Sequence, residues 1–123
     1  MIQGVVNAAY EAVVTLPLQD PEGRTRDVEA VIDTGYSGFL TLPPGLVDEL
    51  GLPFAYMGQA FLANDAVVDF DVHDVTLLWD GQPRRIKADA TGSTPLVGMA
   101  MLDRHDLNVE VVNGGRVLIQ ARP

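Results

Sequence analysis

Apolar and polar residues alternate with a period of two along most of this chain, and turn-forming pairs interrupt the alternation roughly every eight to twelve residues. A period of two is the strand period, because successive side chains of a strand point to opposite faces of a sheet. The sequence therefore predicts an all-β domain of about seven or eight short strands, in a barrel or sandwich. The turn-forming pairs are Asp20-Pro21, Glu22-Gly23, Asn64-Asp65, Asp80-Gly81 and Asn113-Gly114.

One stretch of the chain departs from this alternation. Residues 44–51 place Leu46, Val47 and Leu50 on one helical face, with Pro44 suited to the first helical position and Gly51 to the left-handed C-cap. At 123 residues the chain has room for one core, so we expect a single domain over residues 1–123. Strands are expected within 5–18, 24–32 and 38–43, and hairpins within 56–72, 74–90 and 107–120. Residues 94–102 form an apolar run with a glycine inside it.

Composition narrows the functional classes. The formal net charge is −9, and the eight basic residues are scattered except for Arg84, Arg85 and Lys87. A nucleic-acid surface needs clustered Lys and Arg, so no nucleic-acid partner is expected. The absence of cysteine excludes disulfides and thiolate sites. No apolar run of about 18 residues is present, and residues 1–14 lack the basic start of a signal peptide, so we expect a soluble cytoplasmic protein with no membrane partner.

One acidic residue stands in an unusual place. An apolar run ends on Asp33, Thr34 and Gly35 follow at once, and a second apolar run begins at Phe39. Asp and Gly form turns readily, so a simple turn between two strands is one interpretation. A carboxyl group at the end of a buried strand loses hydration, however, which costs free energy unless the group is hydrogen-bonded or protonated. This context favours a carboxylate that is held in place for chemistry.

Two segments together form a recognisable pattern, Val31-Ile32-Asp33-Thr34-Gly35 and Leu96-Val97-Gly98. Apolar-apolar-Asp-Thr-Gly, followed later in the chain by apolar-apolar-Gly, resembles the retropepsin-like (clan AA) aspartic proteases. A hairpin with its tip near Asn64-Asp65 lies between the two motifs, where that family has its flap. The segment 33–43 is similar to the small bacterial single-domain members, and the resemblance extends from about residue 10 to the C-terminus.

The resemblance implies a closed retropepsin-like acid-protease barrel with one or two short helices. It also implies an aspartic endopeptidase that acts on a peptide or protein substrate and needs no cofactor and no metal. Because one such domain carries one catalytic Asp, the active form would be a homodimer in which two Asp33 carboxylates share a proton and activate a water. The implied site residues are Asp33, Thr34 and Gly35 for catalysis, Ser37, Ala63, Asn64 and Asp65 for substrate binding, and Leu96, Val97 and Gly98 for support of the catalytic loop.

Two residues differ from the family's pattern. Tyr36 stands where Ser or Ala is usual, so a bulky ring is expected beside the cleft, and Met99 stands where retroviral members have an Arg. The flap tip also lacks glycine. Two alternatives therefore stay open. One is a catalytically weak or inactive dimeric module of the same fold that binds peptide or protein, and the other is a barrel in which Asp-Thr-Gly is coincidental.

Other polar residues predict less specific roles. His73 and His105 each adjoin an Asp, but an exposed His in a polar turn is favoured over a base or a metal ligand. Asp69 and Asp71 share one face of a strand, which is favoured as a solvated face over a calcium site. Trp79 is expected in the core or at an interface.

Overall fold

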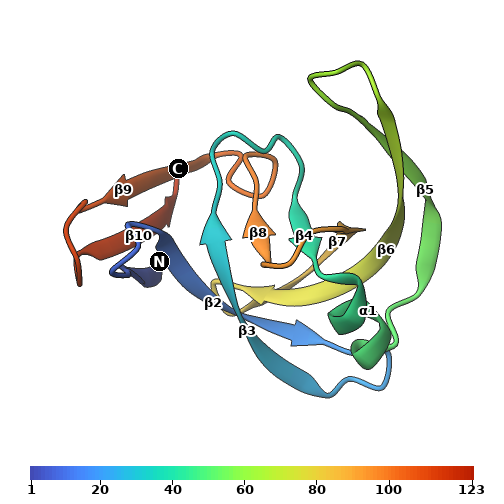
Figure 1. Ribbon diagram of the computed structural model, residues 1–123. Helices are drawn as coiled ribbons and strands as arrows, with labels where there is room; N and C mark the ends of the chain where they lie inside the picture. The colour runs from blue at the N-terminus through green and yellow to red at the C-terminus, as the bar shows by residue number, and fades with distance from the viewer.

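The computed structural model describes residues 1–123, and it is built almost entirely from strands (Figure 1). The predicted all-β class is confirmed, with ten strands where seven or eight were expected and one helix. That helix is far too short and too polar to cross a membrane. The bounds are β1 Ile2–Val6, β2 Ala12–Gln19, β3 Thr25–Ile32, β4 Leu40–Leu42, α1 Pro44–Leu50, β5 Phe54–Phe61, β6 Val67–Trp79, β7 Gln82–Ala90, β8 Leu96–Val97, β9 His105–Val109 and β10 Arg116–Ala121.

All ten strands belong to one sheet, in the order β5-β6-β7-β4-β8-β3-β2-β1-β10-β9. Most pairs are antiparallel, but β3–β8 and β4–β7 are parallel. A short additional pairing, of Leu18 with Leu77 and of Gln19 with Thr76, joins β2 to β6 and bends the sheet back on itself. The outer edges of β5 and β9 have no neighbouring strand, so the expected closed barrel describes this sheet only in part.

The core lies on the inner face of the bent sheet. Along β2 the side chains of Val14, Leu16 and Leu18 are buried and Thr15 is exposed, which is the alternation of a strand with one face in the core. Trp79, at the end of β6, is also buried, as the sequence predicts. These residues belong to one cluster of 21 buried hydrophobic side chains, so the chain has a single core.

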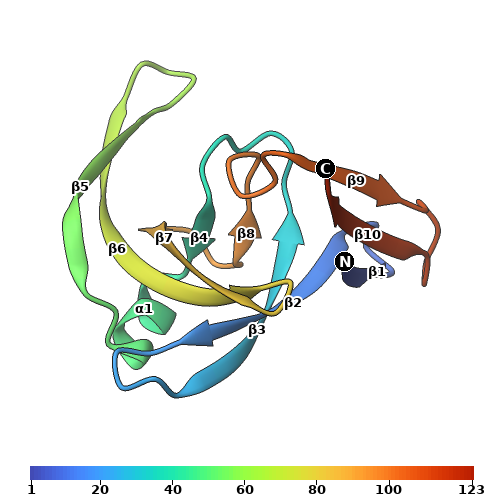
Figure 2. The ribbon, with the colours of Figure 1, turned by 180° about the vertical axis from the view of Figure 1, so that it is seen from behind.

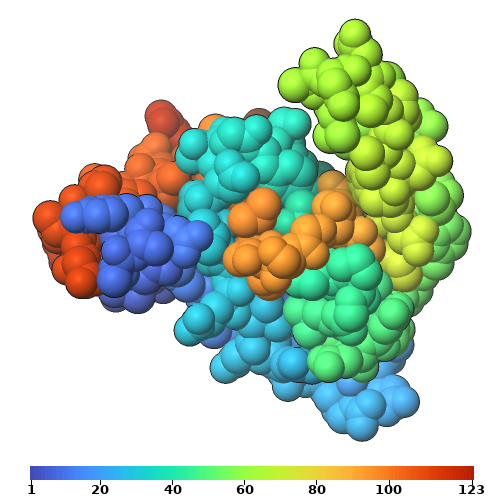
Figure 3. Space-filling view, in the orientation of Figure 1, coloured from blue at the N-terminus to red at the C-terminus, as the bar shows by residue number.

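Two extensions project from opposite sides of this core (Figures 1 and 2). The long hairpin of β5 and β6 curves upward on one side of Figure 1, and β9, β10 and both chain termini lie on the other side. The loop between β3 and β4 reaches the surface between the two extensions. The space-filling view shows a hollow between this loop and the hairpin (Figure 3). The fold therefore places the Asp33 loop and the hairpin on two sides of one depression.

The single run expected over residues 5–18 is wrong, because a turn divides it into β1 and β2. The carboxamide oxygen of Asn7 accepts hydrogen bonds from the backbone N–H groups of Ala9 and Glu11, and Tyr10 takes a positive φ of 60°. An Asn side chain that bonds the backbone in this way competes with strand pairing. The two halves then pair with each other as antiparallel neighbours.

The single helix forms where the sequence predicts it. Val47 and Leu50 of α1 are buried, and Leu46 packs against the core from a partly buried position. Gly51 closes the helix with a left-handed φ of 62°, and its N–H bonds the carbonyl of Asp48. After β8, residues 98–105 form successive hydrogen-bonded turns instead of a second helix.

Candidate functional site

Asp33 follows directly after β3, where this strand lies parallel to β8. Val31 is paired with Leu96 and Ile32 with Val97, so the two motifs of the sequence pattern are adjacent in space. The Asp33 backbone N–H continues this pairing with a 2.9 Å bond to the Val97 carbonyl. Its carboxylate Oδ1 accepts one hydrogen bond, from the Gly35 N–H at 2.9 Å. The backbone therefore fixes the position of the carboxylate, while Oδ2 makes no hydrogen bond within the chain.

Gly98 allows the loop after Asp33 to rest on the segment after β8. Its N–H donates to the carbonyl of Phe39 at 3.0 Å, and the next N–H groups, of Met99 and Ala100, bond the carbonyls of Tyr36 and Gly38. A Cβ atom at Gly98 would lie 2.2 Å from the Gly38 oxygen, which no side chain could occupy. Glycine at this position is therefore required by packing.

The Tyr36 ring lies along this loop and forms part of the cleft wall. The ring covers Gly38 and Gly98, since an added Cβ at either glycine would come within 2.5 Å of Tyr36 atoms. The hydroxyl donates a 2.6 Å hydrogen bond to Oδ2 of Asp89 on β7 and a longer one, of 3.3 Å, to the Leu40 carbonyl. Burial, and then the hydrogen bond to Asp89 and its negative charge, hold the pKa of Tyr36 far above its usual range. Tyr36 therefore remains a neutral hydrogen-bond donor.

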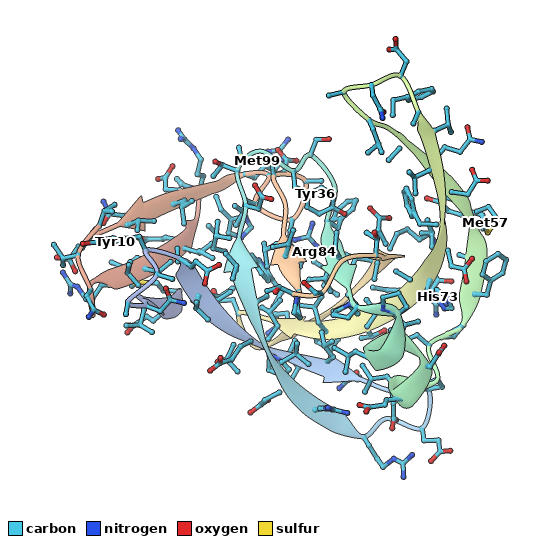
Figure 4. All side chains as sticks on the ribbon, in the orientation of Figure 1. Tyr10, Tyr36, Met57, His73, Arg84 and Met99 are labelled. Atoms are coloured by element: carbon cyan, nitrogen blue, oxygen red, sulfur yellow. The ribbon has the colours of Figure 1, made fainter.

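A cleft of about 510 Å³ lies between this loop and the β5–β6 hairpin. One wall comes from the Asp33 loop and the neighbouring parallel strands, and its residues are Tyr36, Ser37, Gly38, Thr41, Asp89 and Thr91. The opposite wall comes from the hairpin, with Gln59, Ala60, Leu62, Val68 and Phe70. Figure 4 shows Tyr36 on the side of its loop that faces the hairpin, and Met57 on the outer face of the hairpin. The cleft is large enough for several side chains of a bound peptide.

The predicted hairpin is confirmed, and its tip is exposed. Ala63, Asn64 and Asp65 form this tip and do not line the cleft. The tip is a closed turn, because the Leu62 N–H bonds the Ala66 carbonyl and the Asn64 side chain accepts from the Ala66 N–H. Asp65 takes the positive φ of 65° that a glycine would otherwise supply. Asp65 thus takes the place of a glycine in the turn, and the Asn64 side chain closes it.

The part of the Asp33 loop that faces away from the hairpin is open to solvent. Thr34 and Gly35 are exposed, and the side chain of Met99 beside them is 49% exposed. Figure 4 places Met99 at the same end of the molecule as Tyr36. A second molecule could therefore approach Asp33 directly.

The histidines lie elsewhere, and the expectation that they are exposed in polar turns is wrong. His73 lies within β6 and bonds the Leu52 carbonyl through Nδ1 at 2.8 Å. His105 begins β9, where its Nε2 accepts a 3.0 Å hydrogen bond from the Trp79 indole. Both rings are partly buried, and each forms a hydrogen bond there, with a backbone carbonyl or an indole. The sequence does not reveal these partners. Asp69 and Asp71 are exposed, as predicted. No group of three or more metal-ligating side chains is present.

Sequence reasoning did not identify Asp89 or the cleft-lining residues of the hairpin. Strand pairing places Gly58 opposite Phe70 and Ala60 opposite Val68, so these residues share one face of the hairpin. The alternation of polar and apolar residues does not say which face of the hairpin lines the cleft. The sequence does contain one indication that Asp89 is unusual. It is an acidic residue between Ala88 and Ala90, at the end of a strand with buried positions.

The fold is similar to that of a known protein. The structure superposes on the crystal structure of a retropepsin-like aspartic protease from Rickettsia conorii with a TM-score of 0.62. The match covers 98% of this chain and 89% of that chain, at 15% sequence identity. No protein-family model and no curated protein matches the chain. The comparison shows that the fold is retropepsin-like.

Proposed function

We propose that this protein is an aspartic endopeptidase that hydrolyses peptide bonds as a homodimer. One observation carries the proposal: the Asp33 carboxylate stands at the end of β3 in a loop fixed by β8, and residues 36–38 of the same loop line a cleft whose opposite wall is the hairpin. The retropepsin-like fold supports it. The β2–β6 pairing also supports treating β2, β3, β8, β4, β7 and β6 as a closed barrel beneath this site.

The chemistry needs a second carboxylate, because one Asp cannot both activate water and protonate the carbonyl oxygen. In a twofold dimer the two Asp33 groups would share one proton, since two adjacent carboxylates cannot both ionise cheaply. The ionised group takes a proton from water as the water oxygen attacks the scissile carbonyl carbon. The protonated group gives its proton to the carbonyl oxygen. The carboxyl group that took the water proton then gives it to the leaving nitrogen as the C–N bond breaks, and the other carboxylate takes a proton from a hydroxyl of the intermediate, which restores the shared proton.

The neighbouring residues have supporting roles in this proposal. Exposed Thr34 and Gly35 face the side from which a second protomer would approach, so Thr34 is assigned to the contact between the two loops. Ser37 lines the cleft and is assigned to substrate binding. The tip residues Ala63, Asn64 and Asp65 would reach a bound peptide only when the hairpin moves inward. Leu96, Val97 and Gly98 hold the catalytic loop through the backbone contacts described above.

The deciding experiment is cleavage of an internally quenched peptide library by the wild type and by Asp33→Asn, at pH 4 to 7. The Asn oxygen can still accept the Gly35 N–H, so we expect this variant to fold and dimerise but to lose cleavage. Asp27→Asn is the matched control, because Asp27 is an exposed carboxyl on the same strand. Cleavage that survives Asp33→Asn would refute the mechanism.

Subunit mixing tests the shared site directly. Excess Asp33→Asn protein should inhibit the wild type, because mixed dimers hold only one intact carboxylate. Native mass spectrometry shows whether the subunits exchange. If they exchange and the wild type is not inhibited, each protomer acts alone. A folded dimer that binds peptides and cleaves none would instead identify the non-catalytic binding module.

A further inference from the structure

The cleft contains a single charged side chain, that of Asp89. The two walls of the cleft differ in chemistry. The hairpin wall offers the apolar side chains of Ala60, Leu62, Val68 and Phe70, and one amide, that of Gln59. The facing wall offers hydroxyl groups and this one carboxylate. A carboxylate without a cationic partner loses hydration when a ligand covers it against an apolar wall, and a cationic group on that ligand offsets the cost.

Strand pairing fixes the place of Asp89. It lies near the end of β7, between Thr41 of β4 and Val72 of β6, and its neighbour Ala88 is fully buried. The backbone on both sides therefore belongs to the sheet. Strand pairing thus fixes the position of the Asp89 backbone beside the cleft.

Tyr36 fixes the orientation of the carboxylate as well. Its hydroxyl donates to Oδ2 of Asp89 at 2.6 Å, whereas Oδ1 has no hydrogen-bond partner in the chain. No buried polar side-chain atom of the protein lacks a partner, so the free Oδ1 must be open to solvent. Asp89 thus presents one oriented and unoccupied acceptor atom. A preoriented acceptor binds an ammonium or guanidinium group with little loss of side-chain freedom.

We propose that Asp89 makes the cleft selective for peptides that carry a Lys or Arg side chain among apolar neighbours. The cationic group would bond Oδ1 of Asp89, and its aliphatic stem would lie against the apolar hairpin wall, as long basic side chains do elsewhere. Acidic side chains are disfavoured at the same place, by Asp89 and by the protein's net charge of −9. The inference rests on the proposed function in that it assigns the substrate of the same cleft.

Binding to the Asp33→Asn protein tests this selectivity without cleavage. The probes are fluorescein-labelled octapeptides of alanine and leucine, in which one Lys, norleucine or Glu is moved through each position in turn. At one position we expect Lys to bind about tenfold more tightly than norleucine, and Glu more weakly than both. Adding Asp89→Asn should reduce the Lys preference to less than about twofold, with norleucine affinity unchanged. Adding Asp69→Asn is the control, because Asp69 is exposed and lies outside the cleft lining.

Salt provides a second measurement that needs no substitution at Asp89. Raising NaCl from 0.05 to 0.5 M should weaken binding of the Lys peptide and leave the norleucine peptide unaffected, because screening acts on the charged pair. Equal binding of Lys and norleucine at every position would overturn the proposal. So would equal losses for both peptides in Asp89→Asn, since these would assign Asp89 to the peptide backbone.

Selectivity for basic peptides and peptide cleavage can each fail without the other. If the wild type cleaves peptides through Asp33 with no preference for basic residues, the selectivity is wrong and the peptidase stands. If the Asp33→Asn protein selects Lys peptides through Asp89 while the wild type cleaves none of them, the selectivity stands and the peptidase is wrong.

Discussion

The hydroxyl of Tyr36 lies 2.6 Å from Oδ2 of Asp89, and this hydrogen bond ties the loop after Asp33 to a strand 53 residues further along the chain. Tyr36 is one of the two residues that differ from the family pattern, and the sequence predicts a bulky ring beside the cleft. The ring covers Gly38 and Gly98 and forms part of the cleft wall. It braces the loop that carries Asp33.

Removing the Tyr36 hydroxyl should therefore loosen the loop. Tyr36→Phe keeps the ring and loses both hydrogen bonds, so we expect the free energy of unfolding in urea to fall by about 1–2 kcal/mol. Tyr10→Phe is the control, because Tyr10 is 70% exposed and its hydroxyl makes no hydrogen bond within the chain. Equal stability of the two variants would show that the Tyr36–Asp89 bond contributes nothing to the fold.

The same bond predicts a loss of stability at alkaline pH. The pKa of Tyr36 is raised in the folded protein, so its contribution is complete below the unfolded tyrosine pKa of about 10 and is lost as the pH rises above it. The stability difference between the wild type and Tyr36→Phe should be constant up to about pH 9 and should narrow above pH 10. Urea unfolding at pH 8, 10 and 11 measures it. A difference that widens with pH would contradict the assignment.

Gly98 should tolerate no side chain. In Gly98→Ala the new Cβ would meet the Gly38 oxygen at 2.2 Å and the Tyr36 ring at 2.5 Å, so the loop must shift. We expect a loss of about 1–3 kcal/mol in unfolding free energy, together with loss of peptide cleavage. Gly45→Ala is the control: this helical glycine has open space around it, and alanine should stabilise the helix by up to about 1 kcal/mol.

Leu18 and Leu77 should be coupled, because they face each other where β2 meets β6 and both are fully buried. Each change to Ala should cost about 2–5 kcal/mol. The double variant should cost less than the sum of the two, since both substitutions open the same space. Val112→Ala, at an exposed site, should change little. Strict additivity, measured by urea unfolding, would mean that this contact does not join the two strands.

The sequence predicted the features that local chemistry determines. The hairpin turns at Asn64-Asp65, Asp80-Gly81 and Asn113-Gly114 were found from residues that accept positive φ, and the helix was found from its period and its glycine cap. The break at Asn7 was missed because a side chain that bonds the backbone leaves the hydrophobic alternation intact. Local pattern and local turn chemistry thus account for most of the element boundaries.

Only the part of the site that contains the two sequence motifs was predicted. The two motifs lie together as the resemblance implies, because β3 and β8 pair in parallel. The position of Asp89 depends on the pairing of β7 with β4 and β6, which no short stretch of sequence encodes. The direction of the Tyr36 ring depends on the absence of side chains at Gly38 and Gly98, which is a tertiary property.

The two parallel strand pairs also determine when the site can form. Each joins a segment from the first half of the chain to one from its last third, β4 to β7 and β3 to β8. Such long-range contacts are the slow steps of folding, since the intervening chain must be ordered first. During synthesis Asp33 emerges early but has no support until residues 96–98 leave the ribosome. In a partly made chain the Asp33 loop is therefore unsupported, and the cleft beside it is assembled only with the completed fold.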